Sequence, residues 1–138
     1  MPTARELRIQ MEDRPGTLGK LCRALADRGV NVLAVQSFPA KKESSLHLIV
    51  DDLTAAKTIL DSQSTSYSEA DVAKIASPHR PGELARAASR LGDAKININY
   101  SYCGVDPQTN SPFMVFGVAE VGKAVKLLEQ AAVAGTGS

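Results

Sequence analysis

The chain has 138 residues with a net charge of +1, and 43% of its residues are hydrophobic, a composition typical of a folded protein with one ordinary domain or two small ones. The near-neutral charge and an aromatic content of 4% argue against nucleic-acid binding, which needs a basic surface and base-stacking side chains. No segment has the length and apolar character of a secretion signal or a membrane span, and the two cysteines lack metal-ligand spacing, so we expect a cytoplasmic protein without a metal or cofactor.

The first half of the chain predicts a strand, a helix, two strands and a second helix. Residues 6–13 alternate apolar and polar side chains, as in a strand with one buried face. Helical spacing follows in the apolar stripe of Leu18, Leu21, Cys22 and Leu25, and Gly29 lies where a helix-terminating glycine belongs. Residues 30–38 and 45–51 are predicted strands, and residues 55–60 indicate a shorter helix.

The second half predicts the same order of elements. Residues 67–77 are long enough to contain both the closing strand of the first half and the opening strand of the second. Next come a helix with the apolar stripe Leu84, Ala87, Ala88 and Leu91, two strands over residues 98–104 and 112–118, and a last helix from Val121. Only the tail AAVAGTGS remains where a closing strand is expected, so either this tail forms a short strand or another segment completes the sheet.

An internal repeat explains this similarity. Residues 14–32 align without a gap to residues 80–98 at a constant offset of 66. The matches combine turn residues with core positions, which indicates a duplication. The identical pairs are Arg14/Arg80, Pro15/Pro81, Gly16/Gly82, Leu18/Leu84, Leu25/Leu91, Asp27/Asp93 and Asn31/Asn97.

The predicted fold is α+β, with two ferredoxin-like βαββαβ units in tandem and antiparallel sheets that carry helices on one face. We expect the domains to span residues 1–70 and 71–138, with the closing strand of the second short or missing. The third strand of each half is apolar on both faces. We therefore expect the face away from the helices to be covered, by the other half or by another chain.

A strand, then D/H-R-P-G-x-L opening a helix, then a Val/Ile-Asn-Val/Ile strand resembles the ACT domain, and the resemblance covers roughly residues 5–130. ACT domains are typically regulatory modules that pair side by side and bind amino acids or similar effectors between domains. The resemblance implies two sets of ligand-binding residues. They are Arg14, Pro15, Gly16, Thr17, Leu18, Asn31 and Val32 in the first copy, and Arg80, Pro81, Gly82, Glu83, Leu84, Asn97 and Ile98 in the second.

The chemistry of these turns is compatible with an amino-acid ligand. Glycine lets a ligand approach the backbone closely, and the amides and dipole at the start of a helix favour a carboxylate. The alternative interpretation is that Arg-Pro-Gly only makes a good helix entrance. The copies also differ, because His79 replaces Asp13 and Ala85 replaces Gly19, so one pocket can be active while the other is degenerate.

We therefore expect a non-catalytic regulatory protein that binds an amino-acid effector, forms a homodimer and has a metabolic enzyme as a candidate partner. Two scattered histidines and no acid–base constellation argue against an enzyme. The alternative is a ligand-free interaction or dimerisation subunit that regulates a separate metabolic enzyme.

Overall fold

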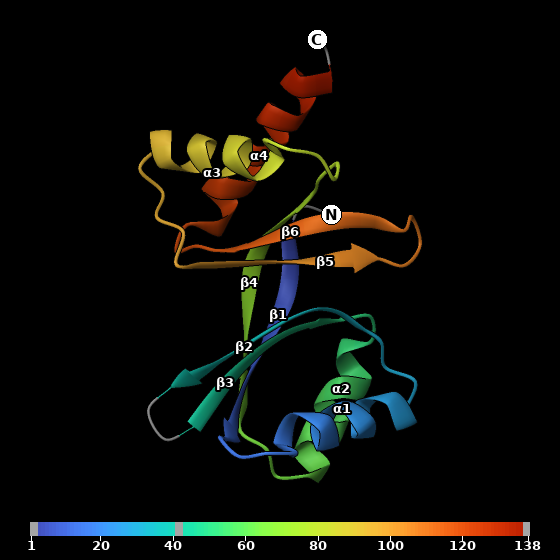
Figure 1. Ribbon diagram of the computed structural model, residues 1–138. Helices are drawn as coiled ribbons and strands as arrows, with labels where there is room; N and C mark the ends of the chain where they lie inside the picture. The colour runs from blue at the N-terminus through green and yellow to red at the C-terminus, as the bar shows by residue number, and fades with distance from the viewer. Residues whose placement is uncertain (1–2, 41–42, 137–138) are drawn as a thin grey trace. The chain divides into compact units, whose positions relative to one another are not determined.

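The computed structural model describes residues 3–40 and 43–136, which divide into two compact units (Figure 1). The first unit consists of residues 5–70. The second unit consists of residues 71–136 together with Thr3 and Ala4 from the start of the chain. Among the helices of these described ranges, none is long and apolar enough to cross a membrane.

The first unit has the predicted order of strand, helix, strand, strand, helix, strand. Strand β3 pairs antiparallel with both β1 and β2, so that Leu48 lies opposite Leu7 on one side and Val35 on the other. Strand β1 also lies beside β4, and the Gln10 N–H donates to the Ser66 carbonyl at 3.2 Å. The elements are β1 (Thr3–Glu12), α1 (Thr17–Asp27), β2 (Val32–Ala40), β3 (Glu43–Val50), α2 (Leu53–Ser62) and the start of β4 (Tyr67–Ala76).

The second unit begins inside β4, which confirms that one continuous strand closes the first half and opens the second. Strand β6 pairs antiparallel with β4 and β5, placing Phe116 opposite Ala73 and Met114 opposite Cys103. The tail forms no strand as far as Thr136, because it continues the last helix. The elements after β4 are α3 (Glu83–Asp93), β5 (Tyr100–Asp106), β6 (Ser111–Gly117) and α4 (Val121–Thr136).

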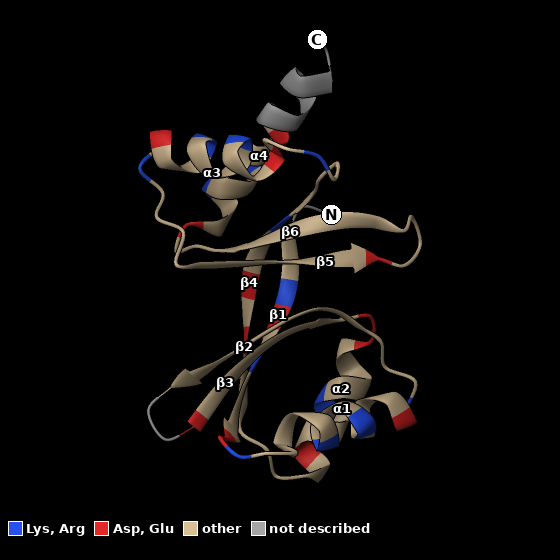
Figure 2. Cartoon of the chain, in the orientation of Figure 1, with Lys and Arg blue, Asp and Glu red and all other residues tan. Residues whose placement is uncertain are grey.

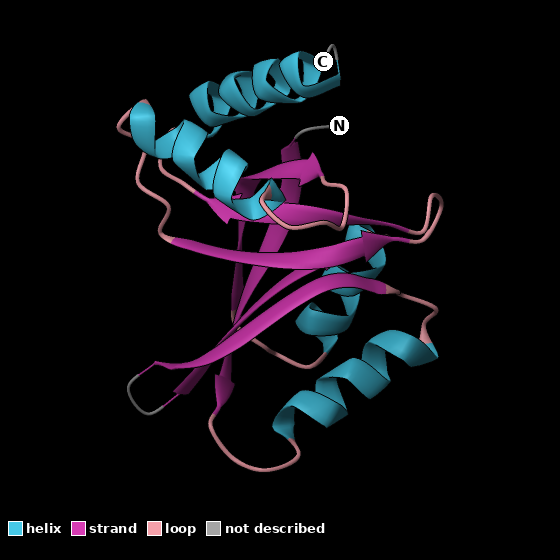
Figure 3. Cartoon of the chain, turned by 45° about the horizontal axis from the view of Figure 1, so that its top comes forward, coloured by secondary structure: helices cyan, strands magenta, loops and turns pink. Residues whose placement is uncertain are grey.

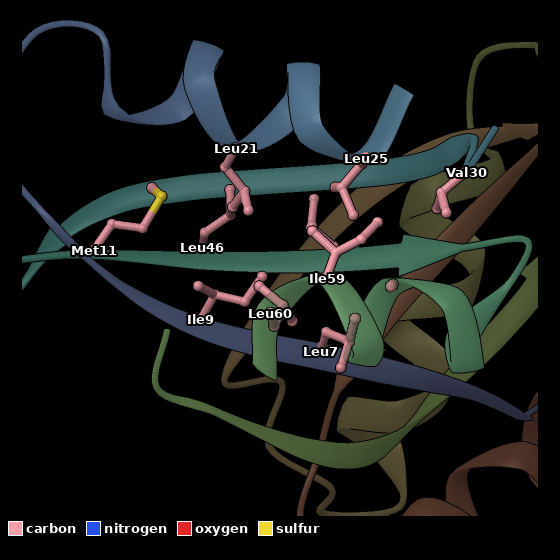
Figure 4. Close-up of a cluster of buried hydrophobic side chains, with 11 residues drawn as sticks. Leu7, Ile9, Met11, Leu21, Leu25, Val30, Leu46, Ile59 and Leu60 are labelled. Carbon is pink, nitrogen blue, oxygen red and sulfur yellow. The ribbon is translucent and has the colours of Figure 1, made fainter. Parts of the chain in front are cut away.

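The core of the first unit forms between one face of its own sheet and the two helices α1 and α2 (Figure 4). The alternation predicted for β1 is confirmed, because Leu7, Ile9 and Met11 are all buried in this cluster. They pack with Leu25 of α1 and Leu60 of α2, which are 1% and 0% exposed. Burial of each such leucine contributes about 1.5–3 kcal/mol, so this apolar face dominates the stability of the unit.

The second core has the same construction, with both of its helices on one face of the sheet (Figure 3). Leu91 of α3 and Leu128 of α4 belong to its buried cluster. Ala73 of β4 and Phe116 of β6 complete the cluster from the sheet, and both are fully buried. Each unit thus carries its two helices on one face of an antiparallel sheet, as the sequence predicts.

The third strand of each unit is buried on both faces, as expected. In β3 the helix-facing Leu48 is fully buried, and on the opposite face His47 and Ile49 are 6% and 4% exposed. In β6 both Val115 and Phe116, which point to opposite faces, are fully buried. Side chains on both faces of these two strands are therefore buried.

The helical stripes are shorter than predicted. Leu18 and Leu84, the first members of the stripes in α1 and α3, are 39% and 56% exposed. Both lie in the first turn of their helices, which the core clusters do not include. Leu25 and Leu91, two turns later in their helices, are buried in the cores instead.

A buried ionic cluster lies at the start of β1, where the sequence indicated only an ordinary polar position. The Glu6 side chain is fully buried, and its Oε1 accepts a hydrogen bond of 2.8 Å from the Arg8 Nε. The Nδ1 atom of His47 lies 3.5 Å from the same oxygen. A buried carboxylate needs such partners, because leaving water costs several kcal/mol.

Candidate functional site

The first Arg-Pro-Gly segment is a tight turn that leads directly into α1. The Thr17 N–H donates to the Arg14 carbonyl at 3.4 Å, with Pro15 and Gly16 at the two central positions. Gly16 has φ 91° and ψ −15°, so proline followed by a left-handed glycine makes a type II turn. Helix α1 begins at Thr17, so Pro15 lies before the helix rather than in its first turn.

The second segment repeats the main features of this backbone. Gly82 has φ 91° and ψ −13°, and helix α3 begins immediately after it. The Arg80 N–H donates to the Pro78 carbonyl at 3.0 Å, as the Arg14 N–H donates to the Glu12 carbonyl at 3.1 Å. The duplication is therefore preserved in the local geometry of both turns.

Both turns need glycine because of the left-handed backbone, not because of crowding. A Cβ built on Gly16 or Gly82 would meet no heavy atom within 4 Å. Residues with a side chain pay about 1–2 kcal/mol in this conformation. The glycines thus set the direction in which the chain enters each helix.

We expect Gly16→Ala to lower the free energy of unfolding by about 1–2 kcal/mol, because alanine is strained at φ 91°. The matched control is Gly19→Ala, three residues later inside α1, where added volume also meets nothing within 4 Å. That control should raise stability by up to about 1 kcal/mol through helix propensity. Urea denaturation measures both, and equal effects of the two substitutions would contradict the turn argument.

Neither α1 nor α3 has a side-chain cap at its start, because each N-cap residue is a glycine. Helix α2 shows the contrast, since the Asp52 carboxylate accepts a hydrogen bond of 3.0 Å from the Ala55 N–H. Uncapped amides and the positive end of the helix dipole favour an anion. The repeated turns therefore leave both helix starts without a capping side chain.

A groove of about 870 Å³, hereafter the first groove, lies beside the first turn. An acidic segment at the end of β1 is followed by a basic one at the start of this turn (Figure 2), and the Arg14 Nε contacts the Glu12 Oε2 at 2.9 Å with both side chains more than 70% exposed. Lys20 also lines the groove and makes no ion pair with any described residue. The lining comprises residues 10–12, 14–17, 20, 21, 43 and 63–66.

The first groove brings together part of the predicted ligand set. Arg14, Pro15, Gly16 and Thr17 line it, whereas Leu18, Asn31 and Val32 do not. Asn31 lies directly before β2, where its N–H donates to the Asp51 Oδ1 at 2.9 Å and its carbonyl accepts from the Asp51 N–H at 3.1 Å. Its backbone therefore ties the start of β2 to the end of β3.

A second pocket of about 360 Å³ lies beside the second turn. It includes Arg80, Glu83 and Leu84 of the predicted set, together with residues 77–79, 101–103, 112–114 and 116. Pro81, Gly82, Asn97 and Ile98 are not part of its lining. The Asn97 side chain instead donates to the Asn99 Oδ1 at 2.9 Å, and Ile98 packs against the second core.

The two turns differ most at the first residue of the helix. Thr17 donates its hydroxyl proton to the Arg14 carbonyl at 3.1 Å. The equivalent Glu83 accepts a hydrogen bond of 2.6 Å from the Arg80 Nε, and its side chain is 13% exposed. The hydrogen bond from Arg80 lowers the pKa of Glu83, so this carboxylate is ionised at neutral pH.

Two features of the site were missed by reasoning from the sequence. Lys20 enters the first groove because it lies one turn after Gly16, on the same side of α1. Residues 63–66 reach the groove because the connection from α2 to β4 passes beside the start of α1. Helical spacing from Gly16 would have indicated Lys20, but no local sequence pattern indicates that residues 63–66 reach the groove.

Residues 5–61 match the family model of the ACT domain. No curated protein matches the chain significantly. A crystal structure of a protein from Bacteroides thetaiotaomicron is 25% identical, with a TM-score of 0.81 over 94% of this chain and 88% of that chain. The ligand-free regulatory subunit of aspartate kinase from Thermus thermophilus is 17% identical, with a TM-score of 0.62 over 94% and 92% of the two chains.

The regulatory subunit of aspartate kinase from Thermus flavus is also 17% identical to the chain. Its TM-score is 0.54, over 95% of this chain and 97% of that chain. Each of these similarities extends over both compact units. The fold of the whole chain is thus shared with these regulatory subunits, and the segment that matches the ACT domain lies within the first unit.

Proposed function

We propose that this chain is a non-catalytic, cytoplasmic regulatory protein whose first groove binds an amino acid or a similar small effector. The observation that carries the proposal is the first groove itself, which opens at the uncapped start of α1 inside the segment that matches the ACT domain. ACT domains are typically modules that bind such effectors, and this groove has the chemistry for one.

The groove offers charges of both signs, as a zwitterionic ligand requires. Arg14 and Lys20 supply positive charge for a carboxylate, next to the start of α1. Glu12 and Glu43 supply carboxylates for an ammonium group. An α-amino acid carries both groups on one carbon, so its two charges find complementary partners within a single groove.

The second unit is proposed to be a second ACT domain, spanning residues 71–138. Its support is the equivalence of the turns at Gly16 and Gly82 and of the helix ends that follow them. The Val30 N–H donates to the Leu25 carbonyl at 3.0 Å, and the Ile96 N–H donates to the Leu91 carbonyl at 2.9 Å. The two copies thus share both the entrance and the exit of their first helix.

Regulation would operate by population shift. An effector stabilises whichever arrangement of the protein binds it more tightly, by no more than its differential affinity. We propose a homodimer that passes this shift to a metabolic enzyme. This role is consistent with the fold, which regulatory subunits of aspartate kinase share.

A thermal-shift screen of the purified chain against the twenty amino acids and a few keto acids tests the proposal. A ligand at a hundred times its dissociation constant adds about 2.7 kcal/mol, which raises the melting midpoint by several degrees. Lys20→Met should remove most of this shift. Arg23→Met is the matched control, because Arg23 is an exposed cation of the same helix outside the groove.

If no compound raises the midpoint, the effector proposal is wrong and the chain is better explained as an interaction subunit. If Lys20→Met and Arg23→Met respond equally, the ligand binds elsewhere than in the first groove.

A further inference from the structure

The internal repeat places Thr17 and Glu83 at equivalent positions, the first residue of α1 and of α3. The glycine before each residue has nearly the same φ and ψ, so the main chemical difference lies in the side chains. One helix start carries a neutral hydroxyl, and the other carries a carboxylate held by Arg80 at 2.6 Å. This carboxylate is part of the lining of the second pocket.

We propose that Glu83 is a built-in substitute for the carboxylate of an effector, so that the second pocket excludes carboxylate ligands and each chain binds one effector in the first groove. This inference rests on the proposed function. Glu83 compensates the positive end of α3, and it already uses the Arg80 Nε. A second carboxylate brought into the pocket would be repelled by the first.

The remaining lining of the second pocket strengthens this argument. The counterpart of the groove cation Lys20 is Arg86, which does not line the second pocket. Much of the lining is apolar or aromatic, including Leu84, Tyr102 and Phe113. A carboxylate entering there would lose hydration without gaining an uncommitted guanidinium or ammonium partner comparable to Lys20.

The ion pair between Arg80 and Glu83 is short and partly shielded from solvent. The Glu83 side chain is only 13% exposed, although the Arg80 side chain is 59% exposed. The pair spans positions i and i+3, so both groups are positioned by the same short turn. Because Glu83 belongs to the same chain, its carboxylate competes with a free carboxylate ligand for the start of α3 at the high effective concentration of an intramolecular group.

The experiment is a titration of the full chain with sodium acetate, followed by ¹H–¹⁵N NMR spectra, with sodium chloride at equal ionic strength as the reference. In the wild type, we expect acetate to shift the amide signals of residues 17–20 but not those of residues 83–86. In Glu83→Thr, which reproduces the first turn, signals of residues 83–86 should shift as well.

Glu120→Thr is the matched control, because it removes one exposed negative charge from the second unit outside the pocket. It should leave residues 83–86 unresponsive. Glu83→Gln, which keeps the size of the side chain, replaces Glu83→Thr if the spectrum of the latter shows that it is unfolded. The gain at residues 83–86 should then appear in Glu83→Gln.

An acetate response at residues 83–86 in the wild type, or no gain in either Glu83 variant, would overturn the inference. The proposed function fails separately. If residues 17–20 of the wild type do not respond while the Glu83 variants gain a response at residues 83–86, the role of Glu83 stands and the first groove is not a carboxylate site.

Discussion

Leu25→Ala and Leu91→Ala should each lower the free energy of unfolding by about 2–5 kcal/mol, measured by urea denaturation. The two leucines are equivalent in the repeat, and they are 1% and 0% exposed. Each substitution removes buried apolar atoms and leaves a cavity between helix and sheet, because the surrounding strands can relax only partly. The losses should be similar, since each leucine sits in the same position of its core.

The controls are exposed valines on the sheet of each unit. Val35 and Val105 are 47% and 49% exposed, so alanine there should change stability by at most about 0.5 kcal/mol. If Leu25→Ala or Leu91→Ala cost no more than its valine control, the corresponding core would not have the packing described above.

Arg8→Met is the second substitution with a large expected effect, about 3–5 kcal/mol of lost stability. Arg8 donates to Glu6 at 2.8 Å, and the Glu6 side chain is fully buried. Methionine keeps much of the length of the side chain but removes the cation. The carboxylate then remains in a medium of low dielectric constant without the Arg8 cation.

Arg5→Met is the matched control for this loss. Arg5 lies on the same strand, and its Nε contacts the Glu69 Oε1 at 3.4 Å, with Arg5 49% and Glu69 22% exposed. Water screens such a pair, so its removal should cost far less than removal of Arg8. Equal losses for the two variants in urea denaturation at neutral pH would show that burial of Glu6 does not set the cost.

Much of the fold follows from patterns that are local in the sequence. Alternation at Leu7, Ile9 and Met11 predicted a strand with one buried face, because successive side chains of a strand point to opposite sides. The helical stripes predicted Leu25 and Leu91 in the cores. Arg-Pro-Gly predicted both turns, since proline and a left-handed glycine restrict the backbone before any packing occurs.

Other features depend on which segments meet, and no local pattern encodes that. Thr3 and Ala4 group with the second unit although they start β1, and β4 serves both units as one strand. The predicted stripes overestimated the burial of Leu18 and Leu84, because a periodic pattern does not indicate how far a helix extends over its sheet. Likewise, the burial of Glu6 was not predicted.

The candidate site also combines features set by the local sequence with features set by tertiary packing. By itself, the sequence determined the duplication, the turns at Gly16 and Gly82, and the strands and helices around them, because these depend on backbone preference and periodicity. Only the tertiary structure decided which side chains share a cavity. It placed residues 63–66 beside Arg14 and left Asn31 outside that groove, because such neighbours are set by chain packing over long sequence separations.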